Sequence, residues 1–240
     1  TEEEITEIKR AIAITNKGIV KMMQNAKAGI NEQQLEAHFN YVIAESLERK
    51  AAFHPTIASG DIAVYLHYND NNRTVNDGEM VLCDVGSRSN YYSSDISRAF
   101  PVNGKFTKQQ KEIYGAALAA NNAVIEFTKP GITFVELNDY CKKVLSEEAI
   151  NRGLIKTEDE LFKYYYHSVS HHMGLDVHDV GDKNQAFVPG MVMTIDTGLY
   201  VAEIGIGLRV EDDVLITNDG CENLSADIVK EIDDIERIMK

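Results

Sequence analysis

The sequence predicts an α+β fold made of two similar halves. Residues 2–25 and 32–50 carry apolar side chains at helical spacing, and residues 51–102 have the pattern of strands broken by polar turns. The same order then returns, because residues 108–128 and a segment ending near residue 152 are again helical, and strand-like runs follow as far as residue 216. Residues 226–239 are expected to form a closing helix or an extended tail.

The predicted helices have recognisable stripes and ends. One apolar stripe of the first helix consists of Ile5, Ile8, Ile12, Ile19 and Met22. Residues 27–31 contain a glycine that ends this helix and Asn31, which is suited to cap the next one. Residues 129–133 repeat this stop and start before the fourth predicted helix.

Two short echoes between the halves favour an internal duplication. A Gly-Ile pair with a nearby Leu occurs within residues 29–35 and again within residues 131–137, and residues 81–86 resemble residues 193–198. The predicted halves cover about residues 1–107 and 108–225 of a single domain that spans residues 1–240. A pseudo-twofold axis between such halves would bring together the strand ends that carry Asp84 and Asp196.

The composition limits the class of protein. A chain of 240 residues with 44% hydrophobic residues can bury a sizeable core, and no apolar run approaches the length of a membrane span. The formal charge of −14 argues against nucleic acid or an anionic membrane as a partner. Three widely spaced cysteines fit neither a disulfide framework nor a thiolate zinc site, so we expect a cytoplasmic protein. We see no signal peptide, and the chain begins at Thr1 rather than Met, so an N-terminal portion could be missing.

Four carboxylates and one imidazole stand at or beside short apolar runs that are predicted strands. They are Asp84, Asp95, His171, Asp196 and Glu211. Carboxylates among Val, Ile and Leu are costly to bury unless positive charge compensates them. Two divalent ions would supply that charge, with Mn²⁺ as the favoured ion and Co²⁺ or Zn²⁺ as alternatives, because these ions accept carboxylate and imidazole ligands. Two ions about 3.5–4 Å apart can share a bridging hydroxide, which is a strong nucleophile at neutral pH.

Each acid also has a simpler interpretation that requires no metal. Asp84 precedes a Val-Gly pair and suits a turn, and Asp95 could pair with Arg98. Asp212 and Asp213 have the pattern of a solvated strand end. The five candidate ligands taken together, with three further histidines nearby, favour a metal site over these separate explanations.

An aspartic protease is the main rival among hydrolases. Residues 196–198 form an Asp-Thr-Gly sequence after an apolar strand, and residues 84–86 form a close variant. Aspartic proteases are all-β, however, whereas helical periodicity covers almost half of this chain. That class would also leave Asp95, His171 and Glu211 without a role, so we set it aside.

At these residues the chain resembles the Xaa-Pro aminopeptidase and prolidase family of metallopeptidases, which have the pita-bread fold. The matching segments are residues 52–60, 66–68, 82–86, 94–101, 170–181 and 209–212. They run over nearly the whole chain in the family's order, so the ordered set is far more specific than any one segment. The resemblance implies a curved antiparallel sheet that is covered by helices.

The resemblance also implies a ligand role for each of the five candidates. Asp84 would bind one metal ion through both oxygens. Asp95 and Glu211 would bridge the two ions, and His171 and Asp196 would complete the shell of the other ion.

Five further residues acquire substrate roles through the same resemblance. His67 and His178 would be catalytic and substrate-binding, because they would flank the scissile carbonyl and the developing oxyanion. The pocket for the residue after the cut would be lined by His167, Tyr200 and Arg209. His172 is expected to pack, since its neighbour already fills the ligand position.

Two departures from the family pattern stand out. The family usually has Glu-Pro-Gly at residues 196–198, and that Glu both binds metal and shuttles a proton, so the catalytic role falls here to Asp196. Aspartate is one methylene shorter, and its carboxylate falls short by roughly 1.5 Å unless the backbone moves. The second departure is the absence of the family's N-terminal domain, which usually shapes the substrate entrance.

Together these features predict a metal-dependent aminopeptidase that releases the N-terminal residue from peptides with proline second. A prolidase, which accepts only Xaa-Pro dipeptides, is the alternative within the same class. A pita-bread binding module with an impaired metal site is the alternative from another class, and Asp196 is its only support in the sequence. We expect proline-containing peptides as partners, no nucleic acid and no membrane, and a homodimer is left open.

Overall fold

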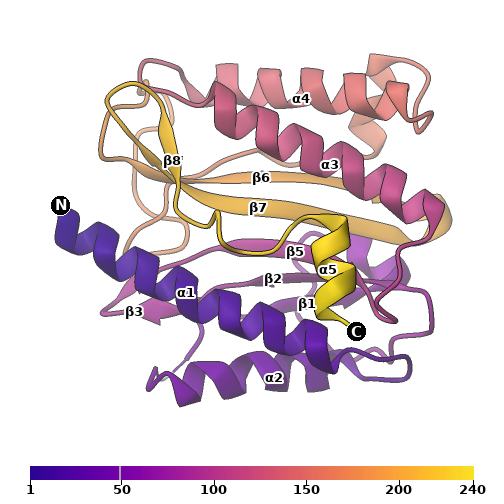
Figure 1. Ribbon diagram of the computed structural model, residues 1–240. Coiled ribbons are helices and arrows are strands. Elements are labelled where there is room, and N and C mark those ends of the chain that lie inside the picture. The colour runs from indigo at the N-terminus through magenta and orange to yellow at the C-terminus, as the bar shows by residue number, and fades with distance from the viewer. Residues whose placement is uncertain (49) are drawn as a thin grey trace.

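Two helices lead into a small antiparallel sheet, and this arrangement occurs twice along the chain (Figure 1). The computed structural model describes residues 1–48 and 50–240. The elements up to residue 101 are α1 (Glu2–Asn25), α2 (Glu32–Glu45), β1 (Thr56–Ser59), the 3₁₀ helix η1 (Gly60–Val64), β2 (Met80–Val85), β3 (Arg88–Ser89), β4 (Tyr92–Ser93) and β5 (Ile96–Pro101). The later elements are α3 (Lys108–Phe127), α4 (Phe134–Asn151), η2 (Glu158–Lys163), β6 (Val192–Val201), η3 (Ala202–Ile204), β7 (Ile206–Ile216), β8 (Cys221–Asn223) and α5 (Ile232–Ile238).

The strands form two three-stranded antiparallel sheets and a short hairpin. One sheet has the order β1-β2-β5 and the other β6-β7-β8, while β3 pairs with β4. Strand β5 lies beside β7, so the two sheets meet in the middle of the molecule, with α1 and α2 on one side and α3 and α4 on the other (Figure 1). The α+β class is therefore confirmed, whereas a division into halves at residue 107 stays a prediction.

The four long helices begin in the same way. Each carries a capping box, in which the side chain of the first residue and a side chain three residues later bond to each other's backbone. The pairs are Thr1 with Glu4, Asn31 with Gln34, Thr107 with Gln110, and Thr133 with Glu136. Helix α1 buries most of the predicted stripe in the main core, and its first member, Ile5, is partly buried against that core. No helix among the described residues combines the length and the apolar character that crossing a membrane requires.

Two predicted elements differ from those observed. Helix α2 ends at Glu45 rather than at residue 50, because Leu47 adopts a φ of 66° and the Glu48 N–H turns back to the Ile43 carbonyl at 3.1 Å. The strand-like runs predicted between residues 152 and 191 are instead the 3₁₀ helix η2 and loops, with an isolated bridge between His172 and Met193.

Part of that loop nevertheless lies along the edge of β6 and is held there by backbone bonds. The Thr194 N–H donates to the His171 carbonyl at 3.1 Å, and the Asp196 N–H donates to the Val169 carbonyl at 2.7 Å. These bonds place the imidazole of His171 next to the strands that carry the acids. The closing segment, for which a helix and an extended tail were both open, forms the helix α5 over Ile232–Ile238.

Candidate metal centre

Strand pairing brings the predicted acids to one place. Asp196 and Glu211 are direct partners across β6 and β7, and Asp84 is opposite Ser97 across β2 and β5. Asp95 stands just before β5, the strand that lies beside β7. Side chains on directly opposite residues project to the same face, so both sheets deliver carboxylates to the region where they meet.

Two groups of potential ligand atoms converge there. Oxygen atoms of Asp84, Asp95 and Glu211 lie within 4.8 Å of one another, and the same holds for one atom each of Asp95, His171 and His178. The Nε2 atom of His171 is 3.3 Å from an Asp95 oxygen and 3.9 Å from a Glu211 oxygen. The structure therefore brings four of the five predicted ligands together.

Asp196 lines the same cavity but stands slightly apart. Neither convergent group among the described residues includes it. One of its oxygens is 3.5 Å from the Nδ1 atom of His167, and the other is buried without a hydrogen-bond partner. The distance of Asp196 from the other donors agrees with its short side chain, because Glu211, its direct partner on β7, has one more methylene.

The crowded carboxylates resist ionisation. Burial raises the pKa of Asp95 well above its usual range, and the charges of Asp84 and Asp196 raise it further. Burial raises the pKa of Glu211 in the same way, followed by the charges of Asp95 and Asp196. Full ionisation at neutral pH therefore needs compensating positive charge in the middle of the group.

The orientation of His171 suits a metal ligand. Its Nδ1 atom is 3.0 Å from the His172 carbonyl, so this nitrogen is assigned the proton and donates it. Burial lowers the pKa of His171, which favours the neutral ring, and the lone pair on Nε2 then faces the Asp95 carboxylate. Either a proton or a metal ion between the Nε2 lone pair and the Asp95 carboxylate relieves their repulsion. A backbone carbonyl on the other nitrogen is a common support for a ligating histidine.

The Arg209 guanidinium is hydrogen-bonded to other side chains of the protein. Its guanidinium donates to an Asp84 oxygen at 2.6 Å and to the Ser97 hydroxyl at 3.1 Å, and it contacts the Tyr200 hydroxyl at 3.4 Å. Only 4% of the side chain is exposed. Arg209 therefore orients Asp84 in this structure, and its predicted contact with substrate stays a prediction.

Tyr200 lies behind His167 and is not among the residues that line the cavity. Its hydroxyl is 2.9 Å from the Nε2 atom of His167. Burial raises the pKa of Tyr200 above its usual range, so the hydroxyl keeps its proton. Tyr200 thus fixes the ring of His167, and a direct role in binding substrate also stays a prediction.

A cavity of about 330 Å³ contains the centre. All five predicted ligands line it, together with His67, His167, His178 and Arg209. The rings of His171 and His178 meet edge to face at 4.3 Å, and burial lowers the pKa of His178. His172 packs edge to face against Phe134, as expected.

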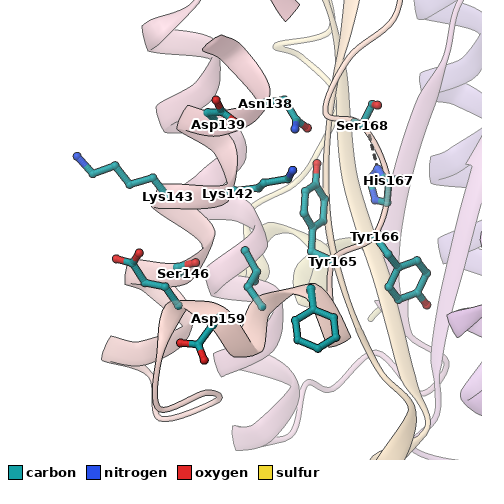
Figure 2. A pocket seen from close by; sticks show the side chains of 13 residues that line it. Asn138, Asp139, Lys142, Lys143, Ser146, Asp159, Tyr165, Tyr166, His167 and Ser168 are labelled. Atoms are coloured by element: carbon teal, nitrogen blue, oxygen red, sulfur yellow. Dashed lines mark hydrogen bonds between the residues drawn. The ribbon is translucent and has the colours of Figure 1, made fainter. Parts of the chain in front are cut away.

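A larger hollow of about 840 Å³ adjoins this cavity, and the two share His167 and Ser168. Figure 2 shows its walls, formed by side chains of α4 on one side and by Tyr165, Tyr166 and His167 on the other. None of the five predicted ligands lines it. The larger hollow is therefore not the chemical centre, although it opens next to it.

The two Asp-X-Gly sequences have a packing reason at their third position. A Cβ atom on Gly86 would lie 1.9 Å from the Ser94 carbonyl oxygen, and one on Gly198 would lie 2.6 Å from the Leu208 carbonyl oxygen. Real atoms cannot approach so closely, so only glycine fits at these positions. The glycines let neighbouring backbone pass close to the strands that carry Asp84 and Asp196.

Sequence reasoning missed Ser97 and Asp213. The Ser97 hydroxyl donates to Glu211 at 2.8 Å, and Asp213 accepts the backbone N–H of Asp95 at 3.1 Å. Alternation along a strand could have found both, since Ser97 is two residues after Asp95 and Asp213 is two residues after Glu211.

The expected solvated strand end is wrong. Asp212 and Asp213 are both fully buried. Arg98 pairs with Asp212 at 2.7 Å rather than with Asp95, and Lys230 pairs with the same aspartate at 2.8 Å. Burial by itself would raise the pKa of Asp212, but these two cations outweigh it and hold that pKa below its usual value. Burial raises the pKa of Asp213 instead, and the charge of Asp95 adds to this effect.

Comparison with known proteins identifies the family. The model of metallopeptidase family M24 matches residues 6–218, which is most of the chain. The chain belongs to metallopeptidase family M24. The resemblance inferred from the sequence motifs is therefore confirmed.

Individual relatives of this M24 member agree with that assignment. The Xaa-Pro aminopeptidase of Escherichia coli is 36% identical, and the match covers 99% of this chain but 58% of the relative. A solved Bacillus anthracis structure assigned to aminopeptidase P is 48% identical, with a TM-score of 0.98 over all of this chain and 57% of that one. Zinc-substituted E. coli aminopeptidase P in complex with product gives 35% identity and a TM-score of 0.94, over all of this chain and 59% of that one. The pita-bread fold is thereby confirmed, and the chain spans a little over half the length of these relatives.

Proposed function

We propose that this chain is the catalytic part of a metal-dependent aminopeptidase that hydrolyses the first peptide bond of peptides with proline in second place. The observation that carries the proposal is the convergence of Asp84, Asp95, His171 and Glu211 in a cavity lined by further histidines. Relatives named Xaa-Pro aminopeptidase and aminopeptidase P, similar over the whole chain, support the choice of substrate.

The residues of the centre fit a pair of divalent ions. Asp84 and Asp196 each keep one buried oxygen without a hydrogen-bond partner, and the Nε2 lone pair of His171 faces the acids. Asp95 belongs to both groups of donors. Glu211 belongs to one of them and lies 3.9 Å from the His171 Nε2 atom, so these two acids suit the bridging role. When bound, two such ions would activate a water molecule and polarise the scissile carbonyl.

The other side chains around that centre would bind substrate, transfer a proton or hold the ligands in position. His67 and His178 line the cavity and would hydrogen-bond the scissile carbonyl as charge develops on its oxygen. Asp196 has one unpartnered oxygen and another beside His167, and in this proposal it would accept a proton and release it to the departing nitrogen. Arg209 and Tyr200 would hold Asp84 and His167 in position around the proline ring.

An aminopeptidase and a prolidase differ in the room that they leave for a peptide that continues past proline. The cavity adjoins the larger hollow at His167 and Ser168, so a chain that continues past proline has room beyond the centre. Room for a longer peptide is what an aminopeptidase requires, and comparing tripeptide with dipeptide hydrolysis distinguishes it from a prolidase.

The decisive experiment measures hydrolysis by the purified chain after loading with Mn²⁺. An Xaa-Pro-Xaa tripeptide should be cleaved after its first residue, an Xaa-Ala-Xaa tripeptide should be cleaved far more slowly, and a chelator should abolish both reactions. Cleavage of the Xaa-Pro dipeptide alone would favour the prolidase. Two bound ions without cleavage of any peptide would support the binding module and refute the enzyme.

Three finer expectations belong to the same proposal. Manganese is the ion we favour, because the donors are mostly carboxylate oxygens. Cys83, Cys141 and Cys221 are all free thiols, which agrees with the predicted cytoplasmic location. Metal analysis of the native protein and sedimentation of the purified chain would test the ion and the homodimer.

A further inference from the structure

A second cluster of polar side chains lies behind the centre, and the proposed chemistry does not use it. It consists of Arg98, Asn121, Asp212 and Lys230, which we call the rear network. Arg98, Asn121 and Asp212 are fully buried, and the side chain of Lys230 is 14% exposed. Because side chains alternate along a strand, Glu211 faces the cavity while Asp212, its neighbour on β7, faces the opposite side.

Arg98 uses every donor that its guanidinium offers. One Nη1 proton goes to the Ser97 carbonyl at 2.9 Å and the other to the Glu211 carbonyl at 2.6 Å. The Nη2 atom donates to Asp212 at 2.7 Å, and the remaining protons go to carbonyls of residues 228–229. Arg98 therefore ties β5 to β7 at Glu211 and ties both strands to the segment before α5.

Lys230 and Asn121 continue the network to β6. The Lys230 ammonium donates to Asp212 at 2.8 Å and to the Asn121 side-chain oxygen at 2.9 Å. The amide nitrogen of Asn121, which belongs to α3, then donates to the carbonyls of Ile195 at 3.1 Å and Val210 at 3.2 Å. One amide thus clamps two neighbouring strands.

The clamped carbonyls are not at arbitrary positions. Ile195 and Val210 immediately precede Asp196 and Glu211, and one of the carbonyls that Arg98 holds belongs to Glu211 itself. The network therefore fixes the backbone from which two of the predicted ligands project, and it does so from the face opposite to them.

We propose that the rear network positions the metal centre by fixing the backbone that carries Asp196 and Glu211 before any cation binds. The proposal rests on the proposed function. Metal–ligand distances tolerate only small deviations, so the strands that carry the ligands need restraint from behind. A buried ion pair is weak support for stability by itself, whereas a fully satisfied network specifies one geometry.

The test measures metal affinity of the folded, metal-free chain rather than activity. Lys230→Met removes one cation but leaves the pair between Arg98 and Asp212, so the fold should persist. Titration calorimetry with Mn²⁺ should show binding weakened by about 10–100-fold, the usual effect of losing a residue that supports a ligand. The visible spectrum of bound Co²⁺ should change as well, because ligand geometry sets it.

Two further variants sharpen the result. Lys230→Arg keeps the charge and the donors, and should recover most of the affinity. Asn121→Ala removes the clamp on the two carbonyls while both cations stay paired, so the test survives if Lys230→Met fails to fold. The control is Lys9→Met, which breaks an exposed pair with Glu222 at 2.7 Å and should leave the affinity unchanged.

The outcomes separate this inference from the proposed function. If the wild-type chain binds Mn²⁺ and the folded Lys230→Met and Asn121→Ala variants bind it within twofold of the wild type, with the same Co²⁺ spectrum, the positioning role is refuted alone. If the wild-type chain binds no divalent ion, the proposed function fails and the positioning role fails with it. A lowered unfolding midpoint with unchanged affinity would show that the network is merely structural.

Discussion

Lengthening Asp196 by one methylene should tighten the binding of a second metal ion. Asp196 and Glu211 are direct partners across β6 and β7, and the Glu211 side chain is longer by one C–C bond of about 1.5 Å. Metal–oxygen distances tolerate deviations of only about 0.2 Å. Asp196 also falls outside both convergent groups of ligand atoms. The Asp196→Glu change should therefore lower the Kd of the weaker ion by about 10–100-fold, or about 1.4–2.8 kcal/mol.

Titration calorimetry of Mn²⁺ into the metal-free protein measures this effect. The wild type should bind one ion tightly on the Asp84 side and the second weakly, and Asp196→Glu should bind two ions and hydrolyse an Xaa-Pro-Xaa peptide faster. Asp233→Glu, which adds the same methylene at an exposed position in α5, is the control. If Asp196→Glu binds two ions but turns over more slowly, the site is adapted to aspartate and the reasoning is wrong. Equal affinity of the wild type for two ions would refute it too.

Three further predictions follow from the charges. Asp95→Asn should reduce hydrolysis by at least about 100-fold and leave at most one bound ion, because a bridging carboxylate holds both; retention of full activity would contradict that role. Burial opposes ionisation of Glu79, yet its bonds to Arg73 and Asn76 prevail and lower its pKa to about 2. Glu79→Gln should therefore reduce the free energy of unfolding in urea by about 1–2 kcal/mol at neutral pH. The difference from the wild type should vanish as the pH falls from 4.5 towards 2. The raised pKa of Asp95 means that the metal-free folded state binds more protons than the unfolded state. The stability of the wild type should therefore fall relative to that of Asp95→Asn as the pH rises above about 4. A difference in urea midpoint that does not change with pH would count against the burial of that charge.

Local signals were sufficient for most of the helices but not for every boundary. The bounds of α1 agree with the apolar stripe and the stop at residues 27–31. The end of α2 was missed because Leu47, rather than a glycine, adopts the left-handed conformation that terminates it. The loops between α4 and β6 were mistaken for strands, since alternation in sequence does not reveal whether a partner strand is present.

The candidate site, like the helices, could be predicted in part. The order of the motifs was enough to predict which acids meet, because strand pairing brings Asp84 and Glu211 from distant segments to one cavity. The burial of Asp212 could not be read from its neighbours in sequence. It depends on Arg98 and Lys230, whose charges arrive from other parts of the fold.

The seam between β5 and β7 has a consequence for the lifetime of the protein. Asp84 and Asp95 come from one side of it, and Asp196 and Glu211 come from the other side, more than a hundred residues later in the chain. A bound ion would therefore act as a reversible cross-link between the two sheets. Loss of the ions would lower the barrier to separating the sheets and expose the chain to proteases. The amount of this protein in a cell would then follow the supply of its metal, quite apart from any effect of that supply on catalysis.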